Sequence, residues 1–195
     1  MKESDYPHPN QNLLIRRFQK KLETVFSINS GDKLVLAISG GSDSMCMLHL
    51  FSLTHPCENL LAVYVNHNLR PDEIQHEIDT VAKVCEQLKV KFSSISVDVP
   101  AFAETHRLST EEAARSLRYQ ALKEYRQKHS AAKICVAHNE NDQVEEFYIR
   151  LIRGTNSTGL SGMNMSHGNI IRPLLDENKQ TLIDHLTMFN IPYCH

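Results

Sequence analysis

Several common sequence patterns are missing from this chain of 195 residues, and each absence excludes a class of protein. The five cysteines form no CxxC pair and their number is odd, which excludes a disulfide-rich scaffold and a zinc ribbon. A Walker A loop (GxxxxGK followed by Ser or Thr) and the dinucleotide fingerprint GxGxxG are also absent. The first ten residues contain no apolar segment, and no apolar run reaches membrane-spanning length. We therefore expect a cytoplasmic protein with neither a signal peptide nor a membrane partner.

A surplus of positive charge is also missing. Lys and Arg together number 21 against 23 for Asp and Glu, so the formal net charge is -2. A protein that binds nucleic acid mainly through the phosphates usually carries a basic surplus. Any nucleic-acid surface of this protein is therefore expected to be local, or to lie on a segment outside this chain.

Apolar runs of strand length alternate along the chain with stretches of helical periodicity. This alternation predicts an α/β fold with a parallel sheet and helices on both faces, in a Rossmann-like arrangement. Thr110 is the expected N-cap of the fourth helix. Strands are predicted at residues 33–38, 60–65, 92–97 and 134–137, with a short extended piece at 170–171. Helices are predicted at residues 12–26, 72–88, 110–128, 141–153 and 179–189, and a further helix beginning at Met45 is expected to end before Pro56.

The segment Ser39-Gly40-Gly41-Ser42-Asp43-Ser44 follows the first predicted strand and precedes a helix. Two glycines let the backbone turn tightly and approach a ligand, and the helix start offers unpaired N–H groups. This combination suits a phosphate or pyrophosphate group. A plain strand-to-helix turn with a serine or aspartate cap explains the composition equally well. Other segments of the sequence are therefore needed to choose between a phosphate-binding loop and a plain turn.

The same loop resembles the pyrophosphate loop of the N-type ATP pyrophosphatases, the PP-loop superfamily, in its pattern Ser-Gly-Gly-x-Asp-Ser. The resemblance implies an adenine nucleotide alpha hydrolase-like fold. It also implies cleavage of ATP to AMP and pyrophosphate, with adenylation of a substrate oxygen. Several families share this loop, including NAD synthetases, GMP synthetases and tRNA thiolases. The missing CxxC pair argues against sulfur transfer.

Five further blocks resemble the tRNA(Ile)-lysidine synthetases, also called synthases, and occur in that family's order over roughly residues 33 to 193. The chain departs from the family pattern at Asn139, where a second histidine is usual, and at Glu146, where a threonine is common. The blocks are Val65–Arg70, Glu111–Tyr119, Ala137–Glu145, Arg153–Met163 and Ile171–Leu175.

The resemblance implies a ligase that forms a C–N bond. It would join L-lysine to C2 of the wobble cytidine of tRNA(Ile), anticodon CAU, through an adenylated cytidine, giving lysidine. ATP and Mg²⁺ are the implied cofactors, tRNA(Ile) and L-lysine are the implied partners, and a homodimer stays open. Residues 1–30 are expected to form a helical lead-in and residues 31–195 the ATP-binding catalytic domain. We expect the chain to lack the family's C-terminal tRNA-binding region.

The implied site residues fall into two groups. Asp43 would repel phosphate unless Mg²⁺ lies between them, so Asp43 and Asp142 are the expected metal ligands. Arg115 suits phosphate through its guanidinium. The implied catalytic residues are Asp43, Asp142, Glu145 and Arg115. The implied nucleotide-binding residues are Ser39, Gly40, Gly41, Ser42, Asp43, Ser44, His67, Arg70, Arg153 and Gly154.

Ordinary structural roles compete with several of these assignments. Asp142 and Glu145 lie three apart at a helix start, where acids are stabilised by the helix dipole alone. Arg115 can be a solvated helix charge, and His67 and His138 can be hydrogen-bonded structural histidines. Two other functions also stay open. One is a PP-loop enzyme that adenylates a different tRNA or a small molecule, and the other is a nucleotide-binding fragment without turnover.

Overall fold

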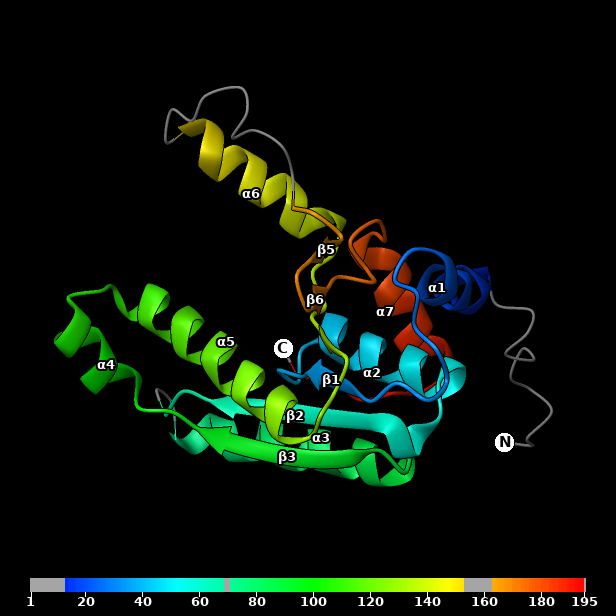
Figure 1. Cartoon of the computed structure of the whole chain (residues 1–195), viewed down its shortest axis with the longest axis horizontal. Helices are drawn as coiled ribbons and strands as arrows, with labels where there is room; N and C mark the ends of the chain where they lie inside the picture. Colours follow the sequence, from blue (N-terminus) through cyan, green and yellow to red (C-terminus); the bar gives the residue numbers. More distant parts are fainter. Residues whose placement is uncertain (1–12, 69–70, 153–162, 195) are drawn as a thin grey trace.

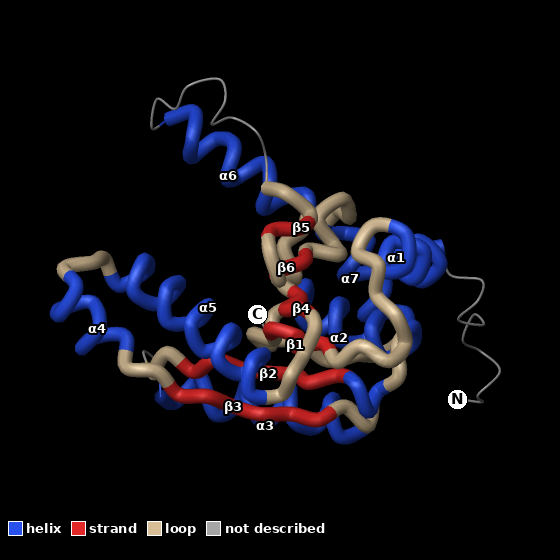
Figure 2. The backbone as a smooth tube through the Cα atoms, in the orientation of Figure 1, coloured by secondary structure: helices blue, strands red, loops and turns tan. Residues whose placement is uncertain are grey.

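The computed structural model describes residues 13–68, 71–152 and 163–194. Its centre is a six-stranded sheet of order β3-β2-β1-β4-β6-β5 (Figures 1 and 2). Within the described residues the paired strands run parallel, except that β5 is antiparallel to β6. The expected α/β class with a mainly parallel sheet is confirmed. The strands are β1 (Leu34–Ala37), β2 (Leu60–Asn66), β3 (Lys91–Ser96), β4 (Lys133–Cys135), β5 (Ser166–His167) and β6 (Ile170–Ile171).

Helices cover both faces of the sheet, as predicted. Helices α1, α2, α3 and α7 pack in one hydrophobic cluster with Leu34 and Leu36 of β1, whereas α5 packs in a second cluster with Val35. All three strand residues are fully buried, because successive side chains of a strand point to opposite faces. The helices are α1 (Leu13–Thr24), α2 (Ser42–Thr54), the short 3₁₀ helix η3 (Cys57–Asn59), α3 (Pro71–Gln87), α4 (Val99–His106), α5 (Thr110–Lys128), α6 (Glu140–Ile152) and α7 (Lys179–Met188).

Helix α4 was not predicted from the sequence. Pro100 reads as a helix breaker, but it lies in the first turn, where its missing N–H costs no hydrogen bond. Asp98 caps the helix by accepting from the Ala101 N–H at 3.1 Å. Arg107 ends it in the left-handed conformation, at φ 54°. Two short-range signals, a cap and a first-turn proline, therefore mark an element that hydrophobic periodicity did not reveal.

The expected cap of α5 was wrong by one residue. Ser109, not Thr110, is the N-cap, and it forms a reciprocal capping box with Glu112. The Ser109 hydroxyl accepts from the Glu112 N–H at 3.2 Å, and the Glu112 carboxylate accepts from the Ser109 N–H at 3.1 Å. A serine followed three residues later by glutamate is the sequence signature of this motif.

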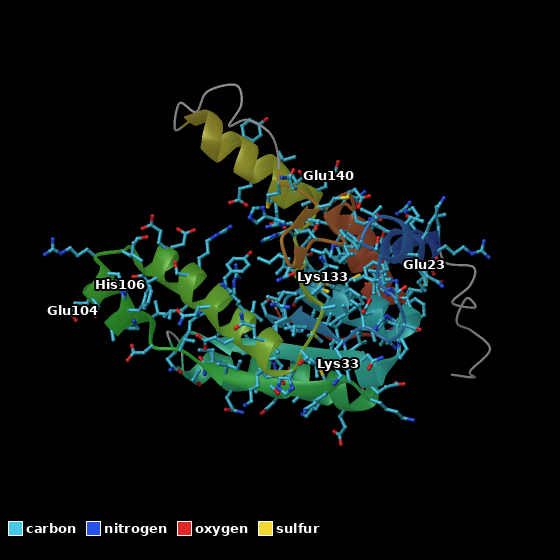
Figure 3. All side chains as sticks on the ribbon, in the orientation of Figure 1. Glu23, Lys33, Glu104, His106, Lys133 and Glu140 are labelled. Atoms are coloured by element: carbon cyan, nitrogen blue, oxygen red, sulfur yellow. The ribbon has the colours of Figure 1, made fainter. Side chains whose placement is uncertain are left out.

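The order of the strands creates a gap at their carboxyl ends. The chain passes from β1 to β2 on one side and later returns to β4 on the other side of β1. Ligands bind at such a switch point in open α/β sheets, because the loops that leave the two strands diverge there. Lys33 and Lys133 mark the opposite, amino-terminal ends of β1 and β4 (Figure 3). The gap therefore lies on the side of the loop at residues 39–44.

Two helical arms extend from the body beside this gap. Helix α6 projects away from the sheet, and α4 with the first half of α5 extends past the sheet on the same side of the view (Figure 1). Glu140 stands at the base of α6, whereas Glu104 and His106 lie on α4 at the far end of the other arm (Figure 3). The carboxyl ends of the strands therefore open between two arms.

Candidate functional site

A cavity of about 730 Å³ lies at the carboxyl ends of β1, β2 and β4. Its wall includes the loop Ser39–Ser44 apart from Gly40, the first turns of α6 and α7, and the last described residues of the chain, Tyr193 and Cys194. Small-molecule sites commonly enclose about 300–1,000 Å³ and are found at switch points of this kind. The loop singled out in the sequence therefore borders a cavity of suitable size.

Each of the two glycines of the loop has its own function. Gly40 adopts φ +85°, a left-handed conformation that side chains other than glycine rarely adopt. Gly41 is the N-cap of α2 at φ -69°, and its residue type provides no side chain to cap the helix. The first N–H groups of α2 lie at the end of the helix that borders the cavity. They therefore have no capping side chain. This is the local arrangement that binds anions at helix N-termini.

Ser44 shapes the loop from inside. Its hydroxyl donates to the Gly41 carbonyl oxygen at 2.9 Å and accepts from the Ser39 N–H at 3.2 Å. The Ser39 and Ser44 hydroxyl oxygens are also 3.2 Å apart. Ser42 is buried as well, and its hydroxyl lies 3.4 Å from an Asp43 carboxylate oxygen. The serines expected to bind phosphate thus border the cavity, and Ser44 also holds the loop in shape.

Asp43 is paired with a lysine that sequence analysis did not identify. The Lys179 ammonium lies 2.8 Å from both carboxylate oxygens of Asp43. Lys179 is the first residue of α7, and Asn178 caps that helix by accepting from the Thr181 N–H at 2.9 Å. Both members of the pair line the cavity. The cavity therefore presents a carboxylate and an ammonium side by side at the start of α2.

Asp142 also lines the cavity, and it has a structural role there. One of its carboxylate oxygens accepts from the Asn139 N–H at 2.8 Å. The Asn139 side-chain oxygen in turn accepts from the N–H groups of Asn141 and Asp142, at 2.8 and 3.2 Å. Asn139, the residue that departs from the family pattern, therefore caps α6, and asparagine is among the best N-cap residues.

Two histidines line the cavity, and burial is the main cause of a lowered pKa in both. His138 has a pKa of about 4, and the neighbouring Arg172 guanidinium lowers it further. His67 has a lowered pKa from burial and from the positive charge of Arg118. Its Nδ1 atom is buried and has no hydrogen-bond partner among the described residues. Both rings are therefore neutral at pH 7 and can offer hydrogen bonds.

Other expected site residues lie outside the cavity wall. Arg115 and Glu145 are exposed on α5 and α6 and are not part of the lining. Arg118, one turn after Arg115, does line the cavity. The guanidinium carbons of Arg115 and Arg118 lie 5.6 and 5.4 Å from the ring centre of Tyr119. Arg70, Arg153 and Gly154 lie outside the residues that the structure describes.

The end of the chain closes one side of the site. The Cys194 N–H donates to the Gly40 carbonyl oxygen at 2.9 Å, and Cys194 forms a parallel bridge with Gly41. Tyr64 and Glu77 add to the same wall, with the Tyr64 hydroxyl donating to the Glu77 carboxylate at 2.5 Å. No sequence signal identified these contacts, because they join segments that are distant along the chain.

No helix in the described ranges is long and apolar enough to cross a membrane. Likewise, no three His, Cys, Asp or Glu side chains of the described residues gather into a group that could hold a metal ion. The polar groups of the cavity include a phosphate-type loop, three carboxylates (Asp43, Glu77 and Asp142), an ammonium, a guanidinium and two neutral imidazoles. The loop, the ammonium and the guanidinium suit a ligand that carries several negative charges.

The chain is similar to curated tRNA(Ile)-lysidine synthases. It is 38% identical over 180 residues to that of Clostridioides difficile (strain 630), which is 89% of this chain and 39% of the relative. It is 36% identical over 182 residues to that of Thermosipho africanus (strain TCF52B), which is 92% of this chain and 42% of the relative. The chain thus spans about two fifths of the length of these curated relatives.

Among solved structures, the fold is similar to that of the U34-tRNA thiolase NcsA from Methanococcus maripaludis with its 4Fe-4S cluster. The TM-score is 0.77 at 19% identity, over 93% of this chain and 64% of that one, so the likeness concerns the fold alone. The PP-loop domain matches residues 14–195, and its loop is the segment that borders the cavity. Together with the geometry of that loop, this match establishes that the chain belongs to the PP-loop domain family, a family that uses ATP.

Proposed function

We propose that the cavity binds ATP with its phosphates on the loop Ser39–Ser44. The support is the uncapped start of α2 at Gly41, the positive φ of Gly40, and the two cations Lys179 and Arg118 in the cavity wall. Phosphates are stabilised by helix N–H groups and by positive side chains, particularly inside a cavity. Asp43 is the one group of the loop that opposes this assignment, because its charge repels phosphate.

The carboxylates are compatible with Mg²⁺ that arrives with the nucleotide. Mg²⁺ is usually held by one or two carboxylates together with substrate phosphates and water. Asp43 and Asp142 both line the cavity and supply those carboxylates. When bound there, Mg²⁺ would neutralise phosphate charge as pyrophosphate leaves. Lys179 neutralises Asp43 in this structure, so the loop carries no unpaired carboxylate.

The reaction that we propose is lysidine formation on tRNA(Ile). The C2 oxygen of the wobble cytidine attacks the α-phosphorus of ATP, and pyrophosphate leaves. The amine of L-lysine then attacks C2, and AMP leaves with the former C2 oxygen. The support is the lysidine synthase relatives at 36–38% identity over about nine tenths of the chain, combined with a PP-loop cavity in this structure.

The exposed site residues fit a substrate that lies across the mouth of the cavity. Arg115 is exposed on α5 and Glu145 is exposed on α6, the helices of the two arms. Arg115 suits an RNA phosphate, and Glu145 suits the ammonium of lysine. The proposed contacts to nucleotide and tRNA also include Arg70, Arg153 and Gly154, and their support is the family pattern alone.

Labelled lysine tests the reaction directly. The full-length protein is incubated with ATP, Mg²⁺, labelled L-lysine and a tRNA(Ile) transcript, and label in the tRNA is measured. A transcript with uridine in place of the wobble cytidine is the matched control and should stay unlabelled. Pyrophosphate release should require both lysine and the cytidine transcript. ATP binding without label transfer to this tRNA would overturn the lysidine proposal and leave the ATP site standing.

A further inference from the structure

A buried arginine fixes the orientation of one cavity histidine. The Nε–H of Arg172 donates to Nδ1 of His138 at 3.1 Å, and its Nη1 donates to the Asn164 carbonyl oxygen at 2.9 Å. Arg172 is only 9% exposed and directly follows β6. Two hydrogen bonds from a planar guanidinium hold both the arginine and the imidazole ring in one geometry.

The direction of this hydrogen bond determines where the histidine carries its proton. A guanidinium has only donors and stays protonated in proteins, so Nδ1 of His138 must accept. An imidazole that accepts at Nδ1 and is neutral carries its proton on Nε2. The second ring nitrogen of His138 is therefore an N–H donor.

The surroundings of His138 keep this state at neutral pH. Burial and the Arg172 charge lower its pKa to about 4, and Arg118 and Arg115 act in the same direction. Asp142 is the one group among these neighbours that raises it. A ring with this pKa neither takes up a second proton at Nδ1 nor carries a full positive charge at pH 7. His138 is suited to donate a hydrogen bond and unsuited to general acid or base catalysis.

His138 also follows the strand next to the one that leads into the phosphate loop. Leu36 of β1 pairs with Cys135 of β4, and Ser39 and His138 each come three residues after that pair, beyond the carboxyl ends of the two strands. Both residues line the cavity. The Nε2–H is thus the nitrogen that the ring can offer to a ligand held by the loop.

We propose that His138 donates a hydrogen bond from Nε2 to a phosphate oxygen of the bound nucleotide, and that Arg172 is the positioning residue that fixes this tautomer. The proposal rests on the ATP site proposed above. It assigns to Arg172 a role that does not require contact with ATP.

Nitrogen-15 NMR of the protein without added nucleotide tests whether Arg172 fixes the tautomer of His138. The wild-type His138 signals should show protonated Nε2 and unprotonated Nδ1. Arg172→Met should give a mixture of both tautomers, and Arg172→Lys should restore the wild-type pattern in part, because its ammonium can still donate. Arg126→Met is the matched control, since Arg126 is a partly buried arginine that donates to the Ala131 carbonyl oxygen instead. A protonated Nδ1 in the wild type would overturn the proposal.

ATP titration tests whether His138 donates a hydrogen bond to the bound nucleotide. His138→Leu should weaken ATP binding about tenfold, as expected for one hydrogen bond to a charged group. His138→Gln, which keeps an N–H donor, should recover most of that loss. Circular dichroism should show that each variant is folded. Unchanged affinity in a folded His138→Leu variant would overturn this inference alone, whereas a wild-type protein that binds no ATP would contradict the proposed function itself.

Discussion

Two walls of the same cavity are built in different ways. The loop wall continues from β1 into α2, where Leu34, Met45 and Leu48 are completely buried. The α6 wall begins with Asp142 in the cavity, but further along the helix Val144 and Tyr148 are 51% and 58% exposed. Buried residues on every side restrict the loop wall to one shape. The α6 wall therefore has a fixed base and an exposed outer part, which suits contact with a large substrate.

The base of α6 is fixed by the segment that joins β6 to α7. The Glu140 N–H donates to the Glu177 carbonyl oxygen and the Gln143 side chain donates to the Leu175 carbonyl oxygen, both at 3.1 Å. Glu177 is itself 5% exposed and pairs with Arg17 at 2.6 Å and with Lys21 at 3.5 Å. Helix α1 thus reaches the site indirectly, through a partly buried ion network at Glu177, the residue whose carbonyl oxygen holds the start of α6.

The largest effect should separate the carboxylate of the loop wall from a carboxylate on the exposed outer part of α6. Asp43→Asn should lower lysine incorporation into tRNA at least about a hundredfold, because it removes a carboxylate that would hold Mg²⁺ beside the reacting phosphates. Glu145→Gln should cost less, about tenfold, and leave ATP affinity unchanged, because Glu145 is outside the cavity. Asp79→Asn, at an exposed position of α3, is the control substitution. Equal losses for Asp43→Asn and Glu145→Gln would remove the distinction between the walls.

Acid should weaken the loop wall through a buried histidine pair. His49 of α2 and His185 of α7 are 2.9 Å apart between Nδ1 and Nε2, and burial lowers the pKa of each to about 4. The unfolded chain takes up these protons near pH 6.5, so stability should be full above that pH and fall as the pH drops to about 4. The loss is on the order of 3 kcal/mol per ring.

Thermal melts across this pH range check the acid effect. His185→Asn removes one titrating ring, so its melting temperature should fall less between pH 6.5 and pH 4 than that of the wild type. NMR titration of either ring near pH 6.5 in the folded protein would contradict the assignment.

The two loop glycines should respond differently to the same substitution. Gly40→Ala should destabilise the protein by about 1–2 kcal/mol, because alanine is strained at φ +85°. Gly41→Ala should change stability by less than about 0.5 kcal/mol, since φ is -69° and the nearest atom to the new Cβ is 3.7 Å away. ATP affinity should nevertheless fall in Gly41→Ala, because the methyl group lies beside the phosphates. Denaturant unfolding and ATP titration measure the two effects, and equal unfolding energies would contradict the strain at Gly40.

The smallest effect should be confined to the start of α6. Asn139→Ala should cost about 1 kcal/mol through loss of the N-cap, and Asn139→Asp should cost little. Hydrogen exchange should speed up in the first turn of α6. Asn178→Ala removes the matching cap of α7 and should speed up exchange in that helix instead. Exchange that rises in both helices for Asn139→Ala would show that the two walls are coupled rather than distinct.

Local patterns in the sequence were sufficient for most of the fold. Buried runs such as 33–38 and 60–65 predicted strands that the structure places at Leu34–Ala37 and Leu60–Asn66. They were recognisable because a strand buried on both faces must be apolar throughout. Helix α4 escaped prediction because its evidence is a cap and a proline rather than periodicity.

Local geometry could predict the site only where its residues follow one another along the chain, whereas Asp142 and His67, which also line the cavity, were expected from the family resemblance. The loop Ser39–Ser44 could be recognised because a tight turn before a helix needs glycine at a defined place. Lys179, by contrast, begins a helix like many solvated lysines, and nothing near it in the sequence indicates Asp43.

The sequence by itself therefore determined the strands, most helices and the phosphate-type loop, because each depends on short-range geometry and on burial periodicity. The tertiary structure decided which charges meet. It brought Lys179 to Asp43 across 136 residues and Arg172 to His138 across 34, and it separated Asp142 inside the cavity from Glu145 outside it. These pairings depend on how the strands are ordered in the sheet, and that order is settled only when the distant segments pack together.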